Sequence, residues 1–153
     1  GSGHEAAAWQ PFETVADGDL VAALRQARSP WRRRSVRVLI SDLLFEARPK
    51  DMLVPLLHDA SALAVIHLVC RQDSHGPEKG NLRLLDAETG HEQELYLDDA
   101  GIELYRRCFE RHQAEWRQAA SEVGAIFITL SDEDLCGNCD LAPLVESELL
   151  NCV

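Results

Sequence analysis

Three short, nearly apolar runs dominate the hydrophobic pattern of the chain. Residues 36–41 read VRVLIS, residues 62–70 read ALAVIHLVC and residues 125–130 read AIFITL. Such runs are typical of strands in a parallel sheet that is covered on both faces, because a half-exposed strand alternates apolar with polar residues. The pattern therefore predicts three parallel strands at these positions.

Before, between and after these runs, apolar residues recur at helical spacings of three and four. The pattern predicts helices over residues 17–29, 51–61, 98–123 and 141–150, and Pro55 should lie in the first turn of the second helix or bend it. A polar loop is expected between the second strand and a β-hairpin whose turn is Glu88-Thr89-Gly90. Ser131 and Asp134 have the spacing of a capping box.

Strands that alternate with helices predict an α/β fold, a Rossmann-like parallel sheet with flanking helices on both faces and a hairpin insertion. Ligands of such sheets bind beyond the carboxyl ends of the strands. Asp42, residues 70–73 and residues 131–134 should share that edge. Asp42, with Ser41, is a candidate Mg²⁺ ligand because this ion prefers oxygen donors, or else its carboxylate caps the turn that follows the strand.

The cysteines give a second candidate site. There are five, an odd number, and three lie in apolar or helical segments, which favours reduced thiols in the cytoplasm over a secreted disulfide framework. Cys136 and Cys139 form a CGNC motif, which could be half a metal site, a redox pair or a structural turn. The histidines form no cluster; His67 is interpreted as a bonded core residue and His112 as part of a helix face.

Composition and charge exclude several classes of protein. Hydrophobic residues make up 46% of the 153 residues, enough for one domain with a core. The net charge of −11 argues against binding to nucleic acid, and no apolar run approaches the roughly 18 residues that a membrane span needs. The chain has no Gly-x-Ser-x-Gly elbow and no glycine-rich phosphate loop, so no enzymatic activity is expected. Residues 1–16 are interpreted as a tag remnant and a weakly patterned leader.

Several segments, taken in order, resemble the carboxyl-terminal half of a bacterial family, the domain of unknown function 58. They are DGDLVAALRQA, RRRSVRVLISDLLFE, LLDAETGHE and the stretch from LDDAGIELYRRCFE to ITLSDEDL, which together cover about residues 17–135. Proteins of this family are similar to von Willebrand factor A domains and are often encoded beside MoxR-type AAA+ ATPases. The resemblance implies that residues 17–153 form a partial von Willebrand A-like domain.

The resemblance also implies a metal-ion-dependent adhesion site, which in A-type domains uses an Asp-x-Ser-x-Ser loop, a Thr and a later Asp. Asp42 matches the later Asp, Gly18 stands where the Thr is expected, and the first loop is missing. The implied site is therefore degenerate, with Mg²⁺ bound weakly or lost. The resulting hypothesis is a cytoplasmic, non-catalytic interaction module that works with a MoxR-type ATPase. Its strand at 36–41 would have an exposed edge, through which the chain could form a homodimer; the alternative is a thiol-based metal or redox protein.

Overall fold

The predicted parallel sheet is present. The computed structural model describes most of the chain, namely residues 31–44, 47–86, 90–136, 140–147 and 149. Strands β1 (Val36–Ser41), β2 (Ala62–Val69) and β5 (Ile126–Ser131) pair in parallel in the order β1-β2-β5. The expected strand bounds hold to within one residue at each end. The first predicted helix, residues 17–29, lies outside the described residues.

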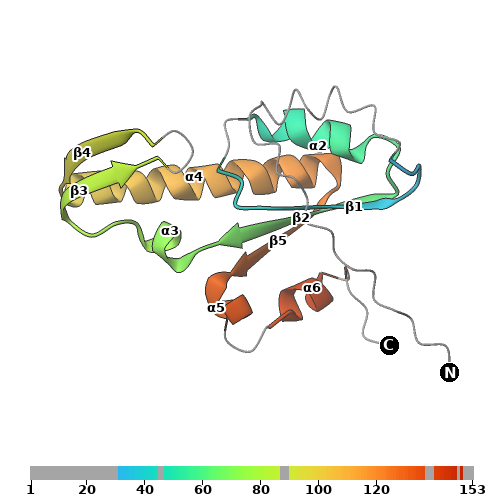
Figure 1. Cartoon of the computed structure of the whole chain (residues 1–153). Helices are drawn as coiled ribbons and strands as arrows, with labels where there is room; N and C mark the ends of the chain where they lie inside the picture. Colours follow the sequence, from blue (N-terminus) through green and yellow to red (C-terminus); the bar gives the residue numbers. More distant parts are fainter. Residues whose placement is uncertain (1–30, 45–46, 87–89, 137–139, 148, 150–153) are drawn as a thin grey trace.

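Helices flank both faces of this sheet, as expected (Figure 1). Helix α2 (Pro49–Leu57) and the long helix α4 (Asp99–Val123) pack against each other on one face, and the short helices α5 (Asp132–Cys136) and α6 (Ala142–Glu146) lie on the other. Two apolar cores result. The larger, between the sheet and the α2–α4 pair, is built on buried residues that include Leu43, Met52, Leu53, Leu63, Val65 and Trp116. The smaller contains Ile66, Ile128, Leu130 and Leu144.

Helix α4 has the ends that its sequence predicts. The Asp98 side chain accepts a hydrogen bond from the Gly101 N–H at 2.8 Å and so caps the first turn. At the other end Gly124 has φ 74°, the left-handed conformation that closes a helix, and the Ala125 N–H donates to the carbonyl of Ala120. The predicted hairpin, β3 (Gly80–Leu85) with β4 (Glu92–Leu97), lies beside the first half of α4, and its residues 88 and 89 lie outside the described part.

Three expectations about the helices were wrong. Helix α2 spans Pro49–Leu57 rather than 51–61, and of the two alternatives for Pro55 the first turn is excluded, because Pro55 lies in the second half of the helix. The polar stretch after β2 is not only loop, because Arg71–His75 forms the short helix α3. The hydroxyl of Tyr105, on α4, donates a hydrogen bond to the Asp73 carbonyl of α3 at 2.8 Å. The last helix ends at Glu146 rather than near residue 150, and a separate helix, α5, follows β5 directly.

Strand β1 is an edge strand. Within the described residues no strand pairs with its outer side. Its side chains alternate: Arg37 and Leu39 face the α2–α4 layer, and the Arg37 guanidinium donates to the Leu56 carbonyl at 2.6 Å. The alternate residues Val36, Val38 and Ile40 point to the opposite face and remain 57%, 48% and 60% exposed. An apolar row on an open strand edge can pair with another chain.

Candidate functional site at the carboxyl edge of the sheet

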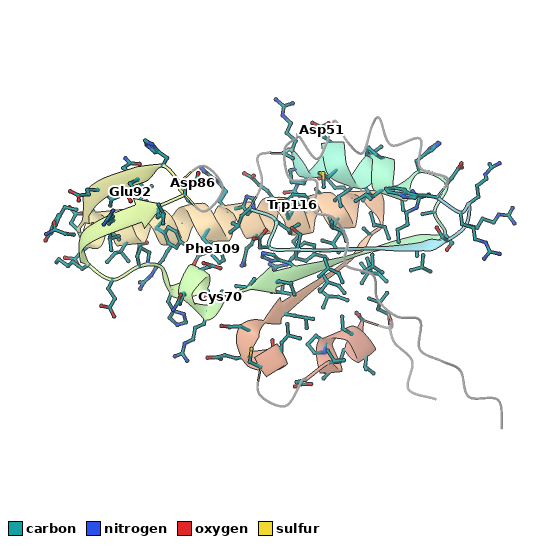
Figure 2. The ribbon with its side chains drawn as sticks, viewed as in Figure 1. Asp51, Cys70, Asp86, Glu92, Phe109 and Trp116 are labelled. Carbon is teal, nitrogen blue, oxygen red and sulfur yellow. The ribbon has the colours of Figure 1, made fainter. Side chains whose placement is uncertain are left out.

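The loops after β2 and β5 are joined to each other at the carboxyl edge. The Asp132 carboxylate accepts hydrogen bonds from the Arg71 backbone N–H at 3.0 Å and from the Cys70 thiol at 3.4 Å. The Arg71 guanidinium in turn forms an ion pair with Glu133 at 2.7 Å. Figure 2 shows Cys70 where β2 meets α3. The edge therefore brings together the two groups of residues, 70–73 and 131–134, that the sequence placed there.

Ser131 and Asp134 form the predicted capping box. The Asp134 carboxylate accepts from the Ser131 hydroxyl at 2.7 Å and from its backbone N–H at 2.8 Å, while the Asp134 N–H donates to the Ser131 hydroxyl at 3.2 Å. The hydrogen bonds from Ser131 hold the pKa of the Asp134 carboxyl below its usual range, because they favour the charged form. The hydrogen bonds between these two residues stabilise the first turn of α5.

Asp42 lies in a tight turn immediately after β1. Its Oδ1 accepts from the Leu44 N–H at 3.1 Å, and the Ser41 hydroxyl accepts from the Leu43 N–H at 3.0 Å. Leu43 has φ 60°, a left-handed conformation that is uncommon for a bulky residue, and its side chain is completely buried. Asp42 therefore stabilises the turn through one carboxylate oxygen while its side chain stays exposed at the sheet edge.

Two histidine side chains, one from α4 and one from β2, lie against this turn. The Nε2 of His112, on α4, lies 2.9 Å from the Leu43 carbonyl oxygen, and the ring of His67, on β2, lies beside the Asp42 backbone. Burial lowers the pKa of His67, the Asp42 backbone opposes that shift, and the nearby His112 and Arg117 add to it. The interpretation of His67 as a core residue agrees with its burial, at 2% exposure, whereas its Nδ1 has no hydrogen-bond partner among the described residues.

Sequence reasoning missed that the two histidines meet at the Asp42 turn. The available signal was the position of His112, which interrupts the apolar face of α4 between Phe109 and Trp116. A polar residue at such a position needs a partner across the interface. The pattern could show that a partner was needed, but the partner itself is 69 residues away in the chain.

Two buried polar atoms near this site have no hydrogen-bond partner among the described residues. They are His67 Nδ1 and the Thr129 hydroxyl. Their residues occupy neighbouring positions on β2 and β5. An unpaired buried polar atom costs about 1–3 kcal/mol. These two unpaired atoms therefore lower the stability of the sheet in this region.

The donors for a metal ion are few. In the part of the chain that the structure describes, no group of three or more His, Cys, Asp and Glu residues lies close enough together to hold a metal ion. Ser41 and Asp42 alone supply one hydroxyl and one carboxylate, and one oxygen of that carboxylate already accepts a hydrogen bond. Mg²⁺ can be held by one or two carboxylates with several waters, so this pair fits part of a site and not a complete one.

The second candidate site is only partly described. Cys136 is an exposed free thiol at the end of α5, and Cys139 lies outside the described residues. The CGNC pair therefore stays a prediction. Among the helices described, none is long and apolar enough to cross a membrane.

These features define a class of protein: an α/β domain with a parallel sheet whose polar carboxyl edge carries the candidate site. The chain belongs to the DUF58 family, described as a protein of unknown function, whose family model matches residues 4–119. It is 32% identical over 120 residues to an uncharacterized protein of Mycobacterium tuberculosis H37Rv, and the match covers 76% of this chain and 37% of that protein. A Mycobacterium bovis protein gives the same values.

A further relative, an uncharacterized protein of Mycobacterium avium, is 31% identical over 120 residues, a match that covers 76% of this chain and 69% of that protein. The chain thus spans little more than a third of the length of the longer mycobacterial relatives. No solved structure was found to match it. The resemblance to the domain of unknown function 58 is therefore confirmed at the level of the family.

Proposed function

We propose that this chain is a non-catalytic protein-interaction module of von Willebrand A-like type, and that it binds its partner at the carboxyl edge of the sheet. The observation that carries the proposal is the exposed Asp42 carboxylate, which lies at this edge on a turn held by hydrogen bonds. Asp132 and Glu133 add further acidic groups beside the neighbouring strands. By the family resemblance, the partner is a MoxR-type AAA+ ATPase, and the edge is a degenerate metal-ion-dependent adhesion site.

The geometry of the described serine and histidine side chains supports a non-catalytic role. Ser74 and His75 lie 3.1 Å apart, the one such contact that could suggest a nucleophile and its base. However, the Ser74 hydroxyl donates to the Arg71 carbonyl at 2.9 Å, and His75 Nδ1 lies 2.9 Å from the same oxygen. Because a carbonyl only accepts, Nδ1 must carry a proton and cannot act as the base.

The proposal predicts that Asp42→Asn weakens divalent-ion and partner binding. Asparagine keeps the side-chain oxygen that accepts from Leu44, so the turn should persist while the charge is lost. We expect the affinity for Mg²⁺, measured by titration calorimetry, to fall by about tenfold or more, because carboxylate charge tunes such sites. Binding to a purified MoxR-type ATPase, measured by surface plasmon resonance, should fall in parallel.

The matched control for this variant is Glu103→Gln, which removes the same charge from an exposed position on α4. It should leave both affinities unchanged. If Asp42→Asn and wild type bind Mg²⁺ and the ATPase equally, Asp42 has no role in recognition and the proposed site is wrong.

A second copy of the chain is the other proposed partner, held through the edge of β1. Antiparallel pairing of two β1 strands would place the basic turn Arg32–Arg34 of one copy beside Asp42 of the other. We expect light scattering to give twice the chain mass of 17.1 kDa, and Val38→Lys to give the monomer, because lysine on an edge strand opposes pairing. Val54→Lys, at an equally exposed valine on α2, should stay dimeric. A wild-type monomer would exclude this contact.

A further inference from the structure

The turn that carries Asp42 is strained and must be held by its surroundings. Leu43 has φ 60° although it is not glycine. A left-handed residue of this kind persists only where the surrounding structure over-determines it. Two hydrogen bonds within the turn, to the Ser41 hydroxyl and to the Asp42 carboxylate, hold the N–H groups of Leu43 and Leu44. The buried Leu43 side chain anchors the turn in the larger core.

The Leu43 carbonyl of the same turn is held from a different direction. His112 reaches the Leu43 carbonyl from α4 at 2.9 Å, and the ring of His67, on β2, lies beside the backbone of the residue before it, Asp42. Because a carbonyl oxygen only accepts, His112 Nε2 must carry the proton of this hydrogen bond. Two histidines from two different elements therefore converge on consecutive residues.

The position of His112 is fixed by its helix. Trp116 lies four residues further on, is completely buried, and contacts the His112 ring edge-on with 6.4 Å between ring centroids. Trp116 is labelled in Figure 2 on α4, where this helix passes α2. Since residues four apart share a helix face, the packing of Trp116 sets the direction of the imidazole. His112 thus connects a rigid helix to the strained turn.

We infer that His112, assisted by His67, is a positioning residue that holds the Leu43 carbonyl and thereby fixes the direction of the Asp42 carboxylate at the sheet edge. The inference rests on the proposed function in one respect, namely that this carboxylate is the recognition group. The partner class that such a site fits is a divalent cation, or a cationic side chain of a protein, because both need one carboxylate held in one direction. Mg²⁺ is the probe used below.

The test compares His112→Ala with His112→Gln by amide hydrogen exchange followed by NMR. Glutamine retains a side-chain N–H donor of similar reach, whereas alanine removes it. In His112→Ala we expect the amides of Leu43 and Leu44 to exchange about tenfold faster relative to the β2 amides, since a single hydrogen bond is worth about that factor. In His112→Gln their exchange should stay close to wild type, and in wild type the nitrogen-15 shift of His112 Nε2 should be that of a protonated nitrogen.

The Mg²⁺ affinity of the three proteins completes the test. It should fall several-fold in His112→Ala and recover in His112→Gln. If the Leu43 and Leu44 amides exchange no faster in His112→Ala than in wild type, or if all amides accelerate alike in both variants, His112 does not position the turn and the inference is wrong. Failure of the proposed function looks different, because the amide result would hold while Asp42→Asn left Mg²⁺ binding unchanged.

Discussion

Trp116→Ala should lower the free energy of unfolding by about 3–5 kcal/mol, the range for a large aromatic residue removed from a core. Trp116 has no exposed surface and packs in the larger core with Leu43, Met52 and Leu63. Its removal leaves a cavity between α4 and the sheet that neighbouring side chains can fill only in part. The loss equals a large share of the stability of an ordinary domain, about 5–15 kcal/mol.

Chemical denaturation followed by circular dichroism measures this effect. Leu104→Ala is the matched control, because Leu104 lies on the same helix and is 56% exposed, and it should change the stability by less than about 0.5 kcal/mol. Equal losses in the two variants would mean that α4 does not pack on the sheet as described.

Stability should also fall on mild acidification because of His67. This imidazole is 2% exposed, and its burial lowers its pKa below the ordinary value of 6.5. The unfolded chain, with the ordinary pKa, therefore binds the proton more readily than the folded protein does. The contribution of His67 is fully present above about pH 6.5 and is lost below it, by at most about 1.4 kcal/mol per pH unit until the folded-state pKa is reached.

The measurement is the free energy of unfolding at intervals from pH 7.5 to pH 5, for wild type and His67→Gln. Glutamine stays neutral, so the variant should have a shallower pH dependence even if it is less stable at pH 7.5. His58→Gln is the control, since the His58 side chain is 81% exposed, and its slope should match that of wild type. A wild-type stability that does not change below pH 6.5 would contradict the burial of a neutral His67.

Much of the fold could be predicted from local patterns. The strands were predictable because a nearly apolar run of six to eight residues between helical segments has few alternatives to a strand of a parallel sheet. The expected cover on both faces was wrong for β1 within the described residues, because every second side chain of this strand is exposed. The long helix was predictable because Asp98 and Gly124 carry their capping chemistry in their own side chains and backbone. The capping box was predictable for the same reason, because Ser131 and Asp134 are only three residues apart in the chain. The short helix α3 was missed, because five polar residues have no periodicity to detect.

For the candidate site, the sequence by itself determined that Asp42 follows a strand and lies at the carboxyl edge of a parallel sheet. It also determined the family, through the order of several motifs along the chain. Only the tertiary structure showed that Asp42 stabilises a strained turn, that His112 on α4 contacts the Leu43 carbonyl of that turn, and that His67 on β2 lies beside it. The physical reason is the range of the interactions: strand and cap signals act over a few residues, whereas these hydrogen bonds form only after α4 has packed against the sheet.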